Sequence, residues 1–259
     1  MSRYAIVIGI NDYTPTERLG LKTLSGAIKD AERMSEWLIT LGGVPAENCH
    51  LITSTADPLN PIKDIVDTAI NNIVIKVAEN AMDADRLYFY FAGHGLGVDF
   101  DLENTGLCMA NWSDYFGDAA SLSSQAYKRK FLSEGLFKEV VIWMDCCRTV
   151  KVSLNPAGPP RIFLRGPNNQ PKWYMAYGTQ YQKQAFEAAL MPEEMRGIFT
   201  KVLLDGLNGA AKHDEGGITS ANLSDYLELN VPLEAQNAGF SQYPEISSNL
   251  TSAKPMLFV

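Results

Sequence analysis

Two stretches decide the fold: RLYFYFAGHG at residues 86–95 and EVVIWMDCC at residues 139–147. Each contains a nearly unbroken run of aromatic and β-branched residues, without the polar positions that alternate along a half-exposed strand. Each then changes abruptly to glycine or to reactive side chains. Strands that are apolar on both faces belong to largely parallel sheets covered by helices on both sides, so the two stretches predict an α/β fold.

The same alternation of short strands and longer helices extends outward from these stretches. Continuous apolar runs and helical spacing predict strands at 4–10, 49–53, 173–177 and 255–259, and helices at 27–41, 61–78, 198–207 and 220–229. With the two opening stretches this gives six strands. We therefore expect one domain, residues 1–259, built as a three-layer α/β/α sandwich around a mainly parallel six-stranded sheet.

The composition is that of an acidic globular protein. Hydrophobic residues make up 46% of the chain and its formal net charge is −8. Nucleic acid is not an expected partner, because phosphate binding needs clustered Lys and Arg. One dense basic cluster stands at residues 128–130, and we interpret it as a solvated helix face.

No signal peptide or apolar segment of membrane-spanning length is visible, so we expect no membrane association. The cysteines lack the spacing of a disulfide framework or of paired zinc ligands, which favours a reducing, cytoplasmic environment. They are Cys49, Cys108, Cys146 and Cys147.

His94 and Cys147 follow the two opening strands and are the residues best placed for chemistry. If these strands are parallel neighbours, both side chains leave the same edge of the sheet, where ligands collect in open α/β folds. A thiol has a pKa of ~8.5, and an imidazole beside it can take its proton and later return that proton to a leaving amine. A strand-end cysteine is also commonly a buried small hydrophobe. The other histidines, His50 and His213, are interpreted as structural or solvated.

Glycines surround His94 at positions 93, 95 and 97. Without a side chain these positions let a peptide approach closely and leave backbone N–H groups free to point inward. The amides of Gly95 and Cys147 are therefore the expected oxyanion hole. A phosphate-cradling loop is the other interpretation of these glycines, but the spacing fits neither Gly-x-Gly-x-x-Gly nor the Walker pattern.

Five motifs along nearly the whole chain give a specific resemblance. They are GINDY at 9–13, LSGAIKDA at 24–31, AGHG at 92–95, DCCR at 145–148, and GIFT at 197–200 with the helix that follows. The chain resembles the caspase-like peptidases, within them the bacterial metacaspase (orthocaspase) branch. The resemblance implies a caspase-like fold, a cysteine endopeptidase and a monomer. It also assigns the nucleophile of Asp-x-Cys to Cys147, although Arg-Thr-Val replaces the usual His-Ser-Gly after it.

The resemblance also implies a specificity. Caspases that cut after aspartate line their pocket with Arg and Gln, and Leu24 and Asp145 stand at the matching positions here. The metacaspase pattern instead places acidic groups at Asp30 and Asp145. Two carboxylates in a narrow pocket prefer a cation, and Arg pairs with carboxylates in a bidentate manner. We expect cleavage after Arg, with Lys second. Otherwise Asp30 is a carboxylate on an early helix turn and Asp145 a capping residue.

The same resemblance divides the domain into a large-subunit-like half at 1–147, a processing loop at 148–172 and a small-subunit-like half at 173–259. Five prolines and two glycines keep helices and central strands out of the loop. An enzyme that cuts after basic residues has candidate sites there at Lys151, Arg161, Arg165 and Lys172. We expect a zymogen matured in this loop by itself or by an upstream protease, or else an ordinary surface excursion.

The expected partners are protein or peptide substrates, and no cofactor is predicted. Many metacaspases need calcium, and Asp99, Asp101 and Glu103 offer oxygen ligands after the histidine loop. Their spacing matches no EF-hand, so no metal is predicted. The alternative from a different functional class is a catalytically silent caspase-like module for binding or scaffolding.

Overall fold

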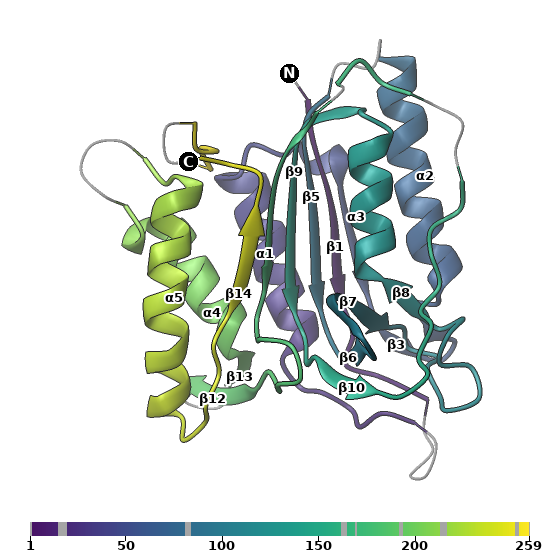
Figure 1. Ribbon diagram of the computed structural model, residues 1–259, viewed down its shortest axis with the longest axis vertical. Coiled ribbons are helices and arrows are strands. Elements are labelled where there is room, and N and C mark those ends of the chain that lie inside the picture. The colour runs from purple at the N-terminus through teal and green to yellow at the C-terminus, as the bar shows by residue number, and fades with distance from the viewer. Residues whose placement is uncertain are drawn as a thin grey trace.

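The computed structural model describes residues 2–14, 20–80, 84–161, 165–168, 170–191, 194–212, 217–251 and 254–258. Its centre is a six-stranded sheet in the order β14-β11-β9-β5-β1-β2 (Figure 1). The strands are β1 (Ser2–Gly9), β2 (Cys49–Thr53), β5 (Ala84–Ala92), β9 (Phe137–Asp145), β11 (Lys172–Tyr177) and β14 (Glu245–Ser248). Every neighbouring pair is parallel except β11 with β14. The predicted α/β class and six-stranded, mainly parallel sheet are confirmed.

Helices cover both faces of the sheet, as Figure 1 shows. One face carries α1 (Ala27–Thr40), α4 (Ile198–Asp205) and α5 (Ser220–Asn237), and the other carries α2 (Lys63–Glu79) and α3 (Ser124–Ser133). Successive strand residues alternate between the two cores: Ile6 packs on the α2–α3 side, while Ala5 and Val7 pack on the α1–α4–α5 side. This alternation on a strand that is apolar at every position is why the sheet is buried on both faces. Two short helical segments, Ala46–Asn48 and Gly206–Ala210, complete the helices of the described residues.

A second, smaller sheet lies at the carboxyl ends of the central strands (Figure 1). Its order is β10-β6-β7-β8, formed by β10 (Thr149–Lys151), β6 (Gly95–Val98), β7 (Asp101–Cys108) and β8 (Ser121–Ser123). Two hairpins add β3 (Thr55–Ala56) with β4 (Leu59–Asn60), and β12 (Glu187–Met191) with β13 (Glu194–Gly197). The small sheet begins at Gly95, directly after His94, and at Thr149, two residues after Cys147, so it fixes the direction in which the chain leaves both residues.

The predicted last strand at 255–259 is wrong. In its described part, 255–258, Leu257 makes one isolated bridge to Thr219, and no described strand includes it. The apolar run instead fills the core: the Phe258 ring packs 5.6 Å from those of Trp143 and Tyr174. The sixth place in the sheet belongs to β14, whose burial is only partial.

The basic cluster at 128–130 is not simply a solvated helix face. It lies on α3, but Lys130 is buried and its Nζ lies 2.7 Å from Glu134 Oε1. The Nζ of Lys128 lies 3.5 Å from the centre of the Trp173 ring. Two of the three charges therefore have partners within the chain. Across the described residues, no helix combines the length and the apolar character that crossing a membrane requires.

Candidate active site

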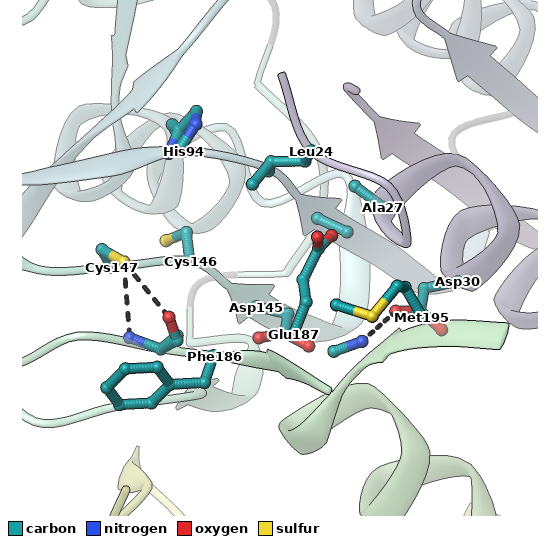
Figure 2. Close-up of a pocket in the computed structure, with 14 residues that line it drawn as sticks. Leu24, Ala27, Asp30, His94, Asp145, Cys146, Cys147, Phe186, Glu187 and Met195 are labelled. Atoms are coloured by element: carbon teal, nitrogen blue, oxygen red, sulfur yellow. Dashed lines mark hydrogen bonds between the residues drawn. The ribbon is translucent and has the colours of Figure 1, made fainter. Parts of the chain in front are cut away.

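The two opening strands are parallel neighbours, and this brings their last residues to one edge. β5 and β9 pair in register up to Ala92 opposite Asp145. His94 follows one strand and Cys147 the other, and both line a cavity of about 250 Å³ at this edge (Figure 2). Asp30 reaches the same cavity from α1, and Asp145 reaches it from the end of β9. The four side chains singled out in the sequence therefore meet in one place.

The imidazole of His94 is held by its Nε2 atom, which lies 2.7 Å from the carbonyl oxygen of Lys22. A carbonyl can only accept, so Nε2 carries the proton and Nδ1 is the basic nitrogen of the neutral ring. The ring also packs 4.8 Å from that of Tyr13, whose hydroxyl accepts the His94 backbone N–H at 2.7 Å. Burial lowers the pKa of His94. The resting imidazole is therefore a neutral base in a fixed tautomer.

Cys147 is engaged with the backbone of Ala185. Its Sγ donates to the Ala185 carbonyl at 3.4 Å and accepts the Ala185 N–H at 3.4 Å (Figure 2). Burial raises the pKa of Cys147, and the Asp145 carboxylate raises it as well. The resting pair is thus a neutral thiol and a neutral imidazole, without a hydrogen bond between them, and the thiol must turn away from Ala185 to meet His94.

Gly95 packs against the nucleophile's own backbone. A Cβ at this position would lie 2.5 Å from the Cys147 carbonyl oxygen and 2.7 Å from Cys146 Sγ, so only glycine fits. The β6–β7 bond at this point runs from Cys108 N to His94 O, 3.0 Å apart, which makes Gly95 and Leu107 a non-hydrogen-bonded pair. The Gly95 N–H is therefore directed away from β7. Among described residues, the Cys147 N–H has no backbone partner either.

Asp30 and Asp145 lie on either side of Gly197, at the start of α4. Asp30 accepts from the Gly197 N–H at 2.6 Å and from Arg196 Nε at 3.1 Å. Asp145 accepts from both the backbone N–H and the hydroxyl of Thr200, at 3.0 and 2.7 Å. A Cβ on Gly197 would collide with Asp145 Oδ2 and come within 3.1 Å of Asp30 Oδ2. The close approach of these two acids therefore depends on a glycine between them.

Burial raises the pKa of both acids, that of Asp30 to about 6 and that of Asp145 to about 7. The charge of Asp30 contributes further to the shift of Asp145, since like charges disfavour ionisation. Hydrogen bonds from Gly197 to Asp30 and from Thr200 to Asp145 lower the two pKa values and so partly offset the effect of burial. Both acids therefore change charge close to neutrality, where a bound cation would draw them into the ionised form.

Glu187 is a third carboxylate of the cavity, and the sequence analysis missed it. It comes from β12 and accepts the backbone N–H groups of Ser25 and Gly26, at 3.0 and 2.9 Å. Figure 2 shows it reaching across the cavity towards the segment of Leu24 and Ala27. No motif marks it, because its place depends on how the β12–β13 hairpin folds back over α1.

Arg148 is the first residue of the Arg-Thr-Val that stands in place of His-Ser-Gly after Cys147, and its side chain makes several buried contacts. Its side chain is fully buried: Nε donates to Thr105 Oγ1 at 3.1 Å, and Nη2 donates to the Leu102 carbonyl. Nη1 lies 2.8 Å from Glu245 Oε2, and the guanidinium stacks 3.9 Å from the centre of the Tyr177 ring. The residue after the nucleophile thus ties the small sheet to β11 and β14.

The four processing candidates differ in their surroundings. Lys151 lies in β10 and pairs with Asp114 at 2.7 Å, and Lys172 opens β11 with its Nζ 3.7 Å from Glu139. Arg161 and Arg165 are exposed and lie outside helices and strands. His50 is on β2, away from the cavity, and His213 falls outside the described residues. Within the described chain the acids at 99, 101 and 103 form no group that could hold a metal.

Comparisons with known proteins agree with this architecture. The family model of the caspase domain matches residues 2–254. A probable protease of a Desulfuromonadales bacterium is 32% identical over 229 residues, which cover 81% of this chain and 26% of that relative, so the chain spans about a quarter of its length.

Solved structures share the fold at low identity. A crystal structure of a Geobacter sulfurreducens protein superposes with a TM-score of 0.62 and 15% identity, over 100% of this chain and 99% of that one. Caspase-1 of Spodoptera frugiperda gives a TM-score of 0.55 and 16% identity, over 99% and 89%. With a family model that extends over nearly every residue, the chain belongs to the caspase-domain family.

Proposed function

We propose that this chain is a cysteine endopeptidase that uses Cys147 and His94 to cleave peptide bonds after basic residues, Arg before Lys. One observation carries the proposal: a thiol, a neutral imidazole and three carboxylates line the same cavity at the carboxyl edge of a parallel sheet. The caspase-domain family supports it, as does the name of the Desulfuromonadales relative. The proposed chemistry uses only groups of the chain itself and water.

The first half of the reaction transfers the peptide's acyl group to sulfur. His94 Nδ1 takes the thiol proton, and Cys147 Sγ bonds to the carbonyl carbon of the substrate. The Gly95 and Cys147 N–H groups stabilise the oxyanion that forms. One such donor typically lowers the activation barrier by roughly 3 kcal/mol. The carbonyl re-forms, the C–N bond breaks, and the imidazolium gives its proton to the departing amine. The Lys22 carbonyl keeps the ring aligned throughout.

The second half returns the enzyme to its starting state. Water replaces the amine, His94 Nδ1 accepts a proton from it, and the hydroxyl oxygen attacks the thioester carbon. The C–S bond breaks, the acid product leaves, and the proton returns to sulfur. The contact of Cys147 with Ala185 belongs to the resting state, so substrate entry must break it. This need, together with the raised pKa of the thiol, fits a precursor of low activity.

The charge around the cavity supports a basic residue before the scissile bond. Asp30, Asp145 and Glu187 line the cavity, and the guanidinium of Arg196 pairs with Asp30 from behind. Arg33 lies 3.9 Å from Asp30 as well, whereas Asp145 and Glu187 have no ion pair among the described residues, which leaves their charges open to a cation of the substrate. A planar guanidinium can bond two carboxylates at once, whereas an ammonium is a single point charge, which favours Arg over Lys. Leu24 and Met195 supply apolar walls for the stem of such a side chain.

Maturation in the 148–172 loop is part of the proposal. Of the four candidate residues for processing, Arg161 and Arg165 are exposed outside any helix or strand, as a cut site requires. The agent is the enzyme itself or an upstream protease.

The experiment is an assay of fluorogenic peptides that end in Arg, Lys, citrulline or Asp, with and without calcium. We expect turnover in the order Arg, Lys, citrulline, with Asp lowest, and no turnover by Cys147→Ala or His94→Ala. A peptide chloromethyl ketone ending in Arg should alkylate Cys147 with loss of chloride and add the mass of the inhibitor less HCl to the tryptic peptide that contains Cys147. Faster cleavage after Asp than after Arg would refute the pocket assignment. Activity that survives in Cys147→Ala would refute the nucleophile, and a wild-type chain that neither cuts nor labels even after cleavage in the 148–172 loop would indicate the silent binding module.

A further inference from the structure

The segment from Asn11 to Tyr13 follows β1 and runs beside the residues that connect β5 to His94. Gly9, the last residue of β1, pairs with Ala92, the last residue of β5. The chain therefore leaves both strands at the same level of the sheet. Neither Asn11 nor Tyr13 lines the cavity, so any part they take in the reaction passes through His94.

Tyr13 holds the backbone of His94 at a point that belongs to no strand. His94 lies between β5 and β6, and its carbonyl accepts the Cys108 N–H at 3.0 Å. The His94 N–H has a side-chain acceptor instead, the Tyr13 hydroxyl, at 2.7 Å. A Cβ on Gly93 would lie 2.7 Å from this hydroxyl oxygen, so the glycine gives the hydroxyl room to approach. Without the hydroxyl, a backbone donor beside the imidazole would lose its acceptor.

The ring of Tyr13 also covers one face of the imidazole. The two ring centres lie 4.8 Å apart with their planes at 58°, and Tyr13 is only 4% exposed. With Nε2 bonded to the Lys22 carbonyl, the imidazole is held both at one face and at one nitrogen. Nδ1 is the nitrogen that must face the thiol. A misplacement of about 1 Å in such a group can lower a rate about 100-fold.

Asn11 holds the segment that carries the Lys22 carbonyl. Its own backbone carbonyl accepts the N–H of Leu24, two residues after Lys22, at 3.0 Å. Its Oδ1 accepts the Ile28 N–H at 3.2 Å, in the first turn of α1, where N–H groups have no partner within the helix. One residue therefore fixes both the start of α1 and the segment that bonds the imidazole.

Ser54, which follows β2, fixes Asn11 in turn. Its Oγ accepts the N–H groups of Asn11 and Asp12, at 2.9 and 3.0 Å, and donates to Asp12 Oδ2 at 2.9 Å. The Ser54 N–H donates to Gly9 O at 3.0 Å, which joins the ends of β1 and β2. Asn11 is thus bonded through its N–H, its carbonyl and its side chain. Rigid support of this kind is what keeps a reacting group aligned.

We propose that Tyr13 and Asn11 are positioning residues of His94. Tyr13 fixes the backbone and one face of the ring, and Asn11 fixes the segment whose Lys22 carbonyl holds Nε2. This inference rests on the proposed function, since the two residues serve the proton transfers at Nδ1. Neither residue binds substrate or exchanges a proton. Their loss lowers kcat because Nδ1 no longer faces the thiol in most molecules, whereas the acids that bind the substrate stay in place.

The first experiment compares Tyr13→Phe with Tyr127→Phe in the turnover of an Arg-ending peptide. Each change removes one hydrogen-bonded hydroxyl from the same core, but that of Tyr127 bonds Asp67 on α2, away from the cavity. For Tyr13→Phe we expect kcat to fall roughly 10- to 100-fold and KM to stay within about threefold of wild type. Tyr127→Phe should keep the kcat of wild type. A wild-type kcat in Tyr13→Phe, or an equal loss in Tyr127→Phe, would overturn the inference.

Asn11 is tested with a conservative rescue. Asn11→Ala removes the acceptor of the Ile28 N–H, and we expect kcat to fall roughly tenfold or more with little change in KM. Asn11→Asp keeps an acceptor oxygen at the same place and should retain most of that kcat. If Asn11→Asp loses as much as Asn11→Ala, the side-chain acceptor does not position the ring and the assignment of Asn11 is wrong.

The second experiment needs no turnover and uses NMR of the full-length Cys147→Ala chain labelled with ¹⁵N-histidine. The chain has three histidines, and the signals that His94→Ala removes belong to His94. We expect one neutral tautomer, protonated at Nε2, and a mixture of tautomers once Asn11→Ala is added. Tyr13→Phe should instead speed hydrogen exchange of the His94 amide. Both tautomers in the parent chain, or variants with the spectrum and exchange of the parent, would overturn the inference.

The two experiments separate this inference from the proposed function. If wild type cuts the Arg-ending peptide and the variants match it in kcat, the positioning role is wrong and the proposed function stands. If wild type cuts no peptide even after cleavage in the 148–172 loop, the proposed function fails, and the catalytic role of Tyr13 and Asn11 fails with it.

Discussion

At the scale of single residues, the two buried acids decide when the cavity is charged. Asp30 has a pKa raised to about 6 and Asp145 one raised to about 7, in both cases chiefly by burial. Below these values the carboxyls bind protons and the cavity loses its attraction for a cation. Above them both are ionised. Burial lowers the pKa of His94, so the imidazole takes up its proton at a lower pH.

We therefore expect kcat/KM for an Arg-ending peptide to rise as pH increases through about 6 to 7, because the free enzyme's carboxyls must lose protons before they bind the guanidinium. Because the pKa values of both acids are raised, the attraction for the guanidinium is present above about pH 6 to 7 and is lost below it. A peptide ending in citrulline, which is nearly isosteric and uncharged, should have its acid limb at lower pH. If kcat/KM depends on pH in the same way for both peptides, a group other than these two carboxyls sets the acid limb.

Glu187 allows a second test on one residue. Its carboxylate accepts two backbone N–H groups, and a glutamine keeps the shape and one acceptor oxygen but loses the charge. For Glu187→Gln we expect kcat/KM to fall about 10- to 100-fold with Arg peptides, in line with the loss of one charge-assisted hydrogen bond, and less with citrulline. Arg-ending and citrulline-ending peptides measured side by side give the ratio. An unchanged ratio would mean that Glu187 only holds the segment of Gly26 in place.

At the scale of elements, Arg148 links three strands behind the nucleophile. It donates to β7 through Thr105 and Leu102, stacks on Tyr177 of β11 and pairs with Glu245 of β14. For Arg148→Met we expect a loss of about 2–4 kcal/mol in the free energy of unfolding, because buried acceptors are left without donors.

The effect of Arg148 on activity works through its backbone, which these side-chain contacts hold in place. Its backbone N–H donates to Lys183 O at 2.9 Å, which holds the segment that carries Ala185 beside Cys147. Arg148→Lys keeps the charge but loses the planar fork, so it should fall between wild type and Arg148→Met in both stability and kcat. Urea unfolding and peptide turnover measure the two. Wild-type stability in Arg148→Met would contradict this bracing role.

The elements also differ in how well the sequence predicted them. β5 and β9 were predicted because they are apolar on both faces, and their adjacency places His94 and Cys147 in the lining of one cavity. β14 has no such run: it is an edge strand, half-exposed, and its place depends on pairing with β11. The run at 255–258 is apolar for a different reason, since Phe258 fills a gap between helix and sheet.

Sequence motifs pointed to some residues of the cavity and not to others. His94, Cys147, Asp30 and Asp145 come from strands and helices with recognisable ends, and all four reach the cavity. Glu187 and the pairing of Arg196 with Asp30 come from the β12–β13 hairpin, whose position over α1 depends on long-range contacts. Local sequence patterns carry no information on such contacts, so the sequence alone does not identify these residues.

At the scale of the whole molecule, the loop connects two halves that share every layer of the fold. β11, which follows the loop, pairs with β9, which precedes it, from Lys172 opposite Glu139 to Tyr177 opposite Met144. Both cores also draw on both halves: Met175 packs on the α2–α3 side, and Tyr174 packs with Trp143 on the other. A cut between β10 and β11 breaks none of these contacts.

We therefore expect the cut chain to remain one particle. A central parallel pair and two shared cores bury far more apolar surface than a dissociating interface would release, and each buried Å² contributes about 25 cal/mol. After cleavage, size-exclusion chromatography should give one peak at the elution volume of the uncut chain, and a denaturing gel should resolve two fragments. Unfolding in urea should shift to a lower midpoint after the cut, because fragments that separate on unfolding gain the entropy that the covalent loop had restricted. If the fragments elute separately without denaturant, the loop rather than the shared sheet holds the molecule together.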